Sequence, residues 1–253
     1  MLLVVDVGNT NIVLGLMEGF ELRHQWRLTT RTYTTDEFGL AMLQLLALEG
    51  VDSATIEGAA IGCVVPSTLY AIQKGIRRYL GLECLVVGQG VKTGMPVRTD
   101  NPREVGADRI VNAVAAREAY GAPVLVVDFG TATTFDCVDS SGAYAGGVIA
   151  PGYQISAEAL FTRTSKLPRV QVERPQRVVG TNTVHSMQSG LFWGYVGLVD
   201  GIAARCKVEL GGEVPCVATG GLANLISGDS QEIDRVDDSL TLRGLRILWE
   251  RNP

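Results

Sequence analysis

The sequence predicts an α/β protein of two related domains, each with a mixed sheet that opens on β-hairpin strands and carries flanking helices. Three observations lead to this fold class. An apolar run ending in Asp-x-Gly occurs twice, with its aspartate at position 6 and again at position 128. Each copy is followed by hairpin-like strands and then by alternating helix and strand patterns. The length of 253 residues suits two domains of common size.

The first domain is expected to span residues 1–120. Residues 1–7 are rich in Leu and Val, as in a buried strand, and residues 8–11 turn the chain into a second strand. The remaining elements are expected in this order: a strand near 20–28, a helix capped by Thr35 or Asp36, a strand at 59–65, a helix at 66–80, a strand at 84–87, a polar loop, and a helix at 107–120.

The second domain is expected to span residues 121–253 and to repeat this plan. Residues 124–129 form another apolar run, and two returning strands are expected at 133–138 and 144–149. The remaining elements are expected as helices near 153–163 and 183–209, a strand at 215–218, a short helix after two glycines, and a final amphipathic helix near 239–250.

Composition and charge narrow the range of functions. Apolar residues make up 46% of the chain and charged residues 19%, so each half can bury a core of its own. The net charge of −5 and the absence of a Lys/Arg block argue against nucleic acid or an anionic membrane as the main partner. No apolar run approaches a membrane span, and no basic segment marks a signal peptide. We therefore expect a cytoplasmic protein.

Both Asp-x-Gly turns have features that suit phosphate groups. In each turn, the glycine lets the backbone approach a ligand closely. Exposed turn amides form a concavity that binds anions, and the hydroxyls of Thr10, Thr131 and Thr133 add hydrogen-bond donors. An ordinary hairpin turn is the alternative for one copy alone. Because the Asp-x-Gly turn occurs twice, each time before a similar order of strands, the phosphate-binding interpretation is favoured.

The aspartates of these turns need a separate explanation. Carboxylates so close to phosphates would repel them unless they hold a cation or its waters. Asp6 and Asp128 are therefore interpreted as organisers of Mg²⁺ or another cation.

A third element is a strand that ends on Gly220-Gly221 and continues into a helix. Alone it could be an ordinary strand-to-helix turn, but beside two phosphate hairpins it is interpreted as the support for adenosine. The three elements together resemble the actin-like (ribonuclease H-like) ATPase superfamily, which implies ATP bound between two domains. No Walker A sequence occurs, and no G-x-G-x-x-G follows a strand, so neither a P-loop nor a dinucleotide-binding fold is favoured.

Asp108 and Arg109 open the helix expected at 107–120. A carboxylate at a helix start is favoured by the helix dipole, and a plain N-terminal charge beside a surface arginine is one interpretation. The functional interpretation is that Asp108 accepts a proton from a substrate hydroxyl while Arg109 binds a substrate anion. Phosphoryl transfer depends mainly on alignment and charge neutralisation, so a carboxylate suffices as the acceptor.

Five segments in order resemble type III pantothenate kinase: DVGNTNIVLG at 6–15, DNPREVGADR at 100–109, DFGTATTFD at 128–136, GGVIAPG at 146–152 and NTVHSMQSG at 182–190. The match extends over nearly the whole chain. The resemblance implies ATP-dependent phosphorylation of pantothenate to 4′-phosphopantothenate, the first committed step of coenzyme A synthesis. It also implies a homodimer, a monovalent cation such as K⁺ or NH₄⁺, and Mg²⁺ with ATP.

The resemblance also implies a role for each matching position. Asp108 is the expected proton acceptor, Asp128 the expected ligand of the monovalent cation, and Asp6 a candidate Mg²⁺ ligand. The residues expected at ATP are Asp6, Val7, Gly8, Asn9, Thr10, Asn11, Ile12, Val13 and Thr131, together with Gly220 and Gly221. Those expected at pantothenate are Thr99, Gly106, Ala107, Asp108, Arg109 and Thr183, the last from the partner subunit as one option. Family members carry Tyr where this chain has Thr99, a change that weakens or reshapes the expected contact.

Two other functions stay open from the sequence. A non-enzymatic regulatory accessory factor could use the same fold, although a regulator would be free to lose Asp6, Asp108, Arg109 and Asp128, and all four are present. An ATPase or phosphatase would use water in place of the substrate hydroxyl. Pantothenate would then leave its nucleotide hydrolysis unchanged.

Overall fold

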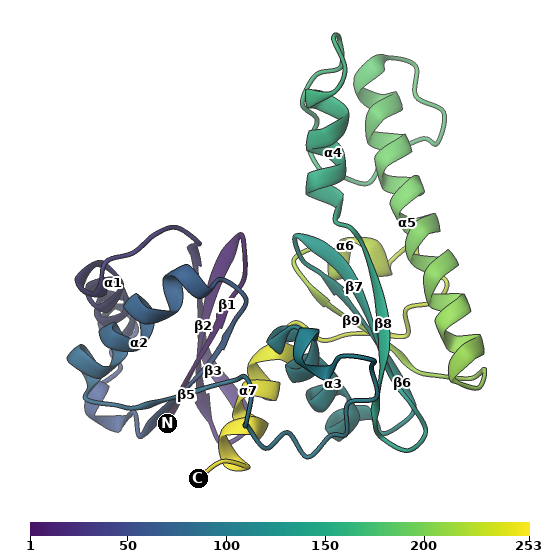
Figure 1. Cartoon of the computed structure of the whole chain (residues 1–253). Coiled ribbons are helices and arrows are strands. Elements are labelled where there is room, and N and C mark those ends of the chain that lie inside the picture. Colours follow the sequence, from purple (N-terminus) through teal and green to yellow (C-terminus); the bar gives the residue numbers. More distant parts are fainter. The chain divides into compact units, whose positions relative to one another are not determined.

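The computed structural model describes residues 1–253 and groups them into two compact units (Figure 1). The first unit comprises residues 1–96, 100–115 and 239–253, and the second comprises 97–99 and 116–238. Each unit contains one five-stranded mixed sheet with flanking helices, which confirms the predicted α/β class. The sequence-based division at residue 120 differs from these units in three places, at the segment 97–99, at residues 116–120 and at the C-terminal residues 239–253.

The sheet of the first unit has the strand order β3-β2-β1-β4-β5. Its strands are β1 (Leu2–Val7), β2 (Asn11–Glu18), β3 (Glu21–Thr29), β4 (Gly58–Cys63) and β5 (Cys84–Val86). The central strand β1 pairs antiparallel with β2 and parallel with β4. Its side chains are buried on both faces, which explains the continuous apolar run in the sequence.

Helices cover both faces of this first sheet. They are α1 (Thr35–Leu48), α2 (Pro66–Leu80), α7 (Leu240–Glu250) and residues 107–115 of α3 (Ala107–Tyr120), with single 3₁₀ turns at Ser53–Thr55 and Pro102–Glu104. Phe38 of α1 and Ile72 of α2 belong to the same buried cluster as Val5 of β1. Helix α1 begins one residue earlier than predicted, because Thr34 is its N-cap and forms a reciprocal capping box with Glu37.

Helix α7 packs into the first unit through glycines. A Cβ added at Gly58 of β4 would lie 2.7 Å from the ring of Trp249, and one added at Gly244 would meet the carbonyl oxygen of Val111 in α3. The Thr241 hydroxyl also donates to Asn112 Oδ1 of α3 at 2.7 Å. These close contacts explain why a helix at the end of the sequence belongs to the first unit.

The sheet of the second unit has the order β10-β9-β6-β7-β8. Its strands are β6 (Val124–Phe129), β7 (Ala132–Val138), β8 (Tyr144–Pro151), β9 (Cys216–Gly220) and β10 (Arg235–Val236). Strand β6 pairs antiparallel with β7 and parallel with β9, as β1 does with β2 and β4, so the internal repeat is structural. The two-residue strand β10 is too short to show a sequence pattern and was not predicted.

The second unit also contains α4 (Tyr153–Thr162), α5 (Thr183–Leu210) and α6 (Ala223–Ser227). Helices α4 and α5 lie side by side (Figure 1). Phe192 and Val199 of α5 pack against Val127 of β6 in one buried cluster. None of the helices in the chain combines the length and hydropathy that a membrane span requires.

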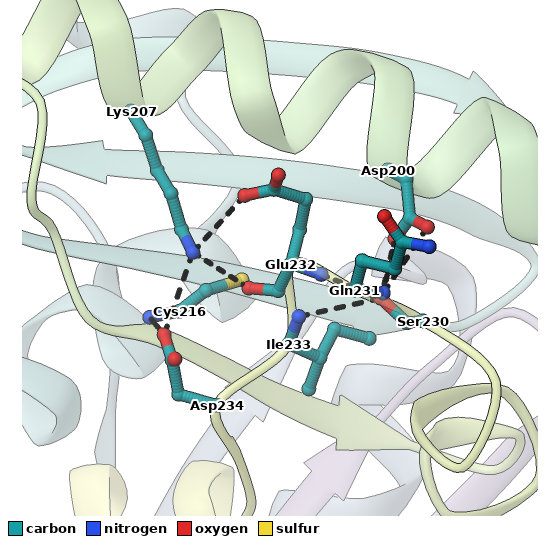
Figure 2. A network of polar contacts seen from close by, with 8 residues as sticks. All are labelled: Asp200, Lys207, Cys216, Ser230, Gln231, Glu232, Ile233 and Asp234. Carbon is teal, nitrogen blue, oxygen red and sulfur yellow. Dashed lines mark hydrogen bonds and ion pairs between the residues drawn. The ribbon is translucent and has the colours of Figure 1, made fainter.

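Polar contacts fix the loop between α6 and β10 to helix α5 (Figure 2). Lys207 donates to the Glu232 carbonyl at 2.8 Å and pairs with the Glu232 carboxylate at 3.1 Å. Burial by itself would lower the pKa of Lys207. The hydrogen bond from the Lys207 ammonium to Glu232 and the negative charges of Glu232 and Asp234 outweigh this effect, so the net pKa is raised. Asp200, about two helical turns earlier, accepts the Gln231 N–H at 3.1 Å. The loop is thus held at two points.

The contact at Gly244 leads to a stability prediction. Alanine in a helix interior normally gains about 1 kcal/mol over glycine. At Gly244 the added methyl would overlap Val111, and overpacking of this kind costs about 1–3 kcal/mol. We expect Gly244→Ala to lower the free energy of unfolding by about 1 kcal/mol, measured by urea denaturation.

The matched control is Gly201→Ala in helix α5, where the nearest atom to an added Cβ is Arg205 Nη1 at 3.5 Å. This variant should be as stable as the wild type or slightly more so. A Gly244→Ala protein at least as stable as the wild type would contradict the packing described for α7.

Candidate active site

The first Asp-x-Gly turn connects β1 to β2. The Gly8 N–H donates to the Asn11 carbonyl at 3.0 Å and closes the turn. Thr30, directly after β3, donates its hydroxyl to the Gly8 carbonyl at 2.6 Å and its N–H to the Thr10 carbonyl at 2.9 Å. The neighbouring strand therefore braces the turn, while the side chains of Asn9 and Thr10 are exposed.

The predicted ATP-binding residues 6–13 differ in what they offer to a ligand. Val7 and Ile12 are fully buried and pair with each other at the end of the β1–β2 ladder, so their side chains offer nothing to a ligand. Asp6 is half-buried at the end of β1 and pairs with Gly62 of β4. A Cβ at Gly62 would lie 3.8 Å from Asp6 Oδ1, so the residue beside this carboxylate has no side chain to cover it.

The second Asp-x-Gly turn connects β6 to β7. The Gly130 N–H donates to the Ala132 carbonyl at 3.1 Å, and both Gly130 and Thr131 are exposed. Gly152, the N-cap of α4, packs on this turn, because a Cβ there would overlap the Thr131 carbonyl and lie 2.8 Å from the Gly130 carbonyl. The start of α4 is therefore in direct contact with the turn.

Gly220 and Gly221 lie against the strand that carries Asp128. The Gly221 N–H donates to the Phe129 carbonyl at 3.1 Å. Gly220 has φ of +91°, and a Cβ there would lie 2.6 Å from Asp128 Oδ1. Position 220 therefore requires glycine both for its left-handed conformation and for the close approach of the carboxylate. The two glycines predicted to support adenosine thus adjoin the Asp128 turn.

The structure contradicts the prediction that the Thr133 hydroxyl binds phosphate. Thr133 is fully buried, and its hydroxyl is hydrogen-bonded to the Tyr195 hydroxyl of α5. Side chains alternate between the two faces along a strand, and Thr133 lies on the face that α5 covers. Thr131 and Thr10 keep exposed side chains.

Asp108 lies in the first turn of α3. Its Oδ1 accepts the Arg109 N–H at 2.9 Å. Burial raises the pKa of Asp108. Three effects lower it in part: the hydrogen bond from the Arg109 N–H, the positive charge of Arg109, and the backbone N–H of Asp108 itself. The net pKa stays above the ordinary value for aspartate. A Cβ at Gly106 would lie 2.5 Å from Asp108 Oδ1, so glycine there allows the carboxylate to fold back on the helix start. The result is a half-buried, oriented carboxylate.

The other predicted substrate residues are distributed over both units. Gly106, Ala107 and Arg109 belong to the first unit and are half-buried. Thr99 belongs to the second unit, and its buried Oγ1 has no hydrogen-bond partner. Thr183 is exposed at the first position of α5. It lines a surface pocket of about 680 Å³ with the residues Leu160, Leu167, Gly180, Thr181, Asn182, Ser186, Met187, Gly190 and Leu191.

Three residues that support the turns were not predicted as functional. Thr30 follows a strand, and nothing in the sequence around it indicates that it supports the turn. Gly152 ends the GGVIAPG segment, where a glycine before a helix hints at close backbone contact. Tyr195 lies in an apolar helical stretch that is equally compatible with core packing, and it is indeed buried.

Solved structures resemble this chain in fold. A Campylobacter jejuni protein assigned to the Baf family of transcriptional activators has a TM-score of 0.60 at 19% identity, covering 99% of this chain and 98% of that one. The ethanolamine utilization protein EutJ from Carboxydothermus hydrogenoformans has a TM-score of 0.57 at 15% identity, covering 97% and 89%. These likenesses show the fold alone, which is the predicted actin-like fold.

Sequence comparison gives the family. The family model for type III pantothenate kinase matches residues 2–205. Proteins named type III pantothenate kinase are 57% identical in Koribacter versatilis, covering all of this chain and 96% of the relative, and 54% identical in Moorella thermoacetica, covering all of both. A third, from Myxococcus xanthus, is 55% identical over all of this chain and 99% of its own. The chain therefore belongs to the type III pantothenate kinase family.

Proposed function

We propose that this chain transfers the terminal phosphoryl group of ATP to pantothenate and forms 4′-phosphopantothenate, the first committed step of coenzyme A synthesis. The observation that carries this function is the oriented carboxylate of Asp108 at the start of α3, in a chain that matches type III pantothenate kinases along its whole length. A kinase needs such an acceptor near the attacking hydroxyl.

In the proposed reaction, Asp108 accepts the proton of the pantothenate hydroxyl as that oxygen attacks the terminal phosphorus of ATP. The carboxylate is held in place by the Arg109 N–H. The Arg109 guanidinium binds the pantothenate carboxylate, since its planar fork matches that geometry. Thr99 supplies a hydroxyl whose hydrogen-bonding capacity is unused within the protein.

The nucleotide is bound at the two glycine turns. The exposed residues Asn9 and Thr10 of the first turn and Thr131 of the second bind the phosphates, and Gly220-Gly221 leave room for adenosine. Asp128 and Asp6 offer the carboxylate oxygens that K⁺, NH₄⁺ and Mg²⁺ bind, and each lies beside a glycine, which places no side chain against the carboxylate. When bound, such cations neutralise phosphate charge. Phosphoryl transfer then depends mainly on how these groups align ATP and pantothenate.

A regulatory accessory factor is the second candidate function. It is suggested by the Campylobacter jejuni structure, whose description names a family of transcriptional activators. The presence of Asp6, Asp108, Arg109 and Asp128 supports the enzyme instead. The net charge of −5 supports an enzyme that uses neither nucleic acid nor an anionic membrane as its main partner. The five free cysteines support a reducing, cytoplasmic location.

We also propose a homodimer in which Thr183 reaches the pantothenate site of the partner subunit. Support comes from the pocket at the start of α5 and from exposed apolar side chains on or near α4 and α5. Ile155 is 44% exposed, Val179 78% and Val184 41%. A dimer interface would bury these apolar side chains.

Replacing Asp108 tests the proton acceptor. With ATP, Mg²⁺, K⁺ and pantothenate, the wild type should release ADP only when pantothenate is present. Asp108→Asn should lower kcat about 10²- to 10⁴-fold, the usual contribution of a general base, with little change in the KM for ATP. A coupled ADP-release assay measures both. Asp52→Asn, at an exposed carboxylate that caps a 3₁₀ turn, is the matched control and should keep full activity.

The pH profile gives a second readout for Asp108. The residue acts as an acceptor only when it is ionised, and its pKa is raised by burial. Activity should therefore fall with decreasing pH through a pKa above the ordinary aspartate value of about 3.9. Undiminished turnover by Asp108→Asn would exclude the assigned role. ADP release that ignores pantothenate would indicate an ATPase, and pantothenate-independent binding to a transcription protein without turnover would indicate a regulator.

Replacing Asp128 tests the cation site. We expect wild-type turnover to rise when K⁺ or NH₄⁺ replaces Na⁺ in the assay. Asp128→Asn removes the negative charge that holds the cation, so half-maximal activation should need at least about tenfold more K⁺, in line with a lost charged contact. An Asp128→Asn enzyme with an unchanged K⁺ dependence would rule out Asp128 as the ligand.

Mixed dimers test whether Thr183 acts across subunits. Sedimentation should give about twice the 27.0 kDa chain mass. Asp108→Asn and Thr183→Arg chains, each inactive alone, are co-expressed with different tags and the mixed dimer is isolated. If Thr183 serves the partner's site, one of the two sites is intact and about half of wild-type activity returns. No recovery would place Thr183 in the same subunit's site, and a monomer would exclude the homodimer.

A further inference from the structure

Tyr195 lies directly behind the second Asp-x-Gly turn. It is 5% exposed and projects from α5 toward β6 and β7. Phe129 and Thr133 form the last register pair of these strands before the turn. The Tyr195 ring packs against the Phe129 ring with centroids 5.9 Å apart, and its hydroxyl is hydrogen-bonded to that of Thr133. One side chain thus contacts both strands at the base of the turn.

The Tyr195 ring also contacts the start of helix α4. It packs edge-on against the ring of Tyr153, the first residue of α4, with centroids 5.4 Å apart. The preceding residue, Gly152, packs on the carbonyls of Gly130 and Thr131. A single buried side chain therefore contacts both the hairpin strand that leaves the turn, through its hydroxyl, and the helix start that lies on the turn, through its ring.

The charge of Asp128 is close enough to act on this phenol. Burial raises the pKa of Tyr195. Its hydrogen bond with Thr133 lowers the pKa in part, and the negative charge of Asp128 raises it again. Tyr195 is therefore uncharged at neutral pH and acts as a hydrogen-bonding support. Its position places it behind both the exposed turn residues Gly130 and Thr131 and the carboxylate proposed to hold the cation.

We propose that Tyr195 is a positioning residue for ATP and the monovalent cation, and that its hydroxyl holds the Gly130–Thr131 turn and Asp128 in their binding geometry. The inference rests on the proposed function, since it takes this turn as a phosphate site. Tyr195 itself is buried and contacts neither substrate. It acts through Thr133 and through the start of α4.

Tyr195→Phe is the direct test because it removes one oxygen and keeps the ring packing on Phe129. The strand that leaves the turn then loses its hydrogen bond from Thr133 to residue 195. We expect the KM for ATP and the K⁺ concentration for half-maximal activity to rise about tenfold, the effect of one lost hydrogen bond. The KM for pantothenate should stay within about twofold, since Asp108 and Arg109 belong to other elements.

Tyr144→Phe is the matched control. Tyr144 is also fully buried in this sheet, and its hydroxyl donates to Asp136 at 2.8 Å. It pairs with Val138, at the end of β7 remote from the turn. Both variants lose a buried hydroxyl and should lose similar thermal stability, but only Tyr195→Phe should weaken ATP and K⁺. If Tyr144→Phe raises the KM for ATP as much as Tyr195→Phe does, the effect is one of general stability and the proposal is wrong.

Thr133→Val removes the other hydroxyl of the pair and serves if Tyr195→Phe does not fold. It should raise the KM for ATP in the same direction, and the double variant should be little worse than Tyr195→Phe alone. Additive effects, or an unchanged KM in both single variants, would overturn the proposal. Calorimetric ATP affinity is measured in parallel. A wild type that binds ATP without phosphorylating pantothenate refutes the proposed function, while the affinities of the variants still test the role of Tyr195.

Discussion

The second turn depends on one steric constraint, which is that the Asp128 carboxylate at the end of the central strand β6 must have a glycine beside it. Asp6 pairs with Gly62 on the neighbouring parallel strand, and Asp128 lies against Gly220. Any larger residue at Gly220 would displace the carboxylate. Each glycine belongs to a parallel strand that follows much later in the sequence. The register of the strand pairing therefore decides whether a glycine lies beside the carboxylate.

Features with a local physical cause could be predicted from the sequence. The apolar runs of β1 and β6, the glycine turns after them and the helix that starts beside Asp108 follow from burial, backbone freedom and helix termini. Features that depend on distant contacts could not. The side of the sheet on which Thr133 lies is decided by where α5 packs, and nothing in the Thr-Ala-Thr-Thr stretch indicates it.

The supports of the two turns differ although their strand plans are the same. The first turn is braced by Thr30, which bonds its main-chain carbonyls from the next strand. The second is braced from behind by Tyr195 and from the side by Gly152. Repetition of the fold has thus preserved the turn and the carboxylate, while each unit stabilises them with different residues. This divergence explains why comparison of the two halves reveals the turns and not their supports.

The membership of α7 in the first unit has a consequence for the order of folding during synthesis. Residues 239–253 are translated only after the whole of the second unit, yet Trp249 and Gly244 complete the packing of β4 and α3 in the first. Domains generally fold as their residues leave the ribosome, with the N-terminal one first. Here that order is reversed at its final step. The second unit can form its core first, while one face of the first sheet stays uncovered until α7 has been synthesised.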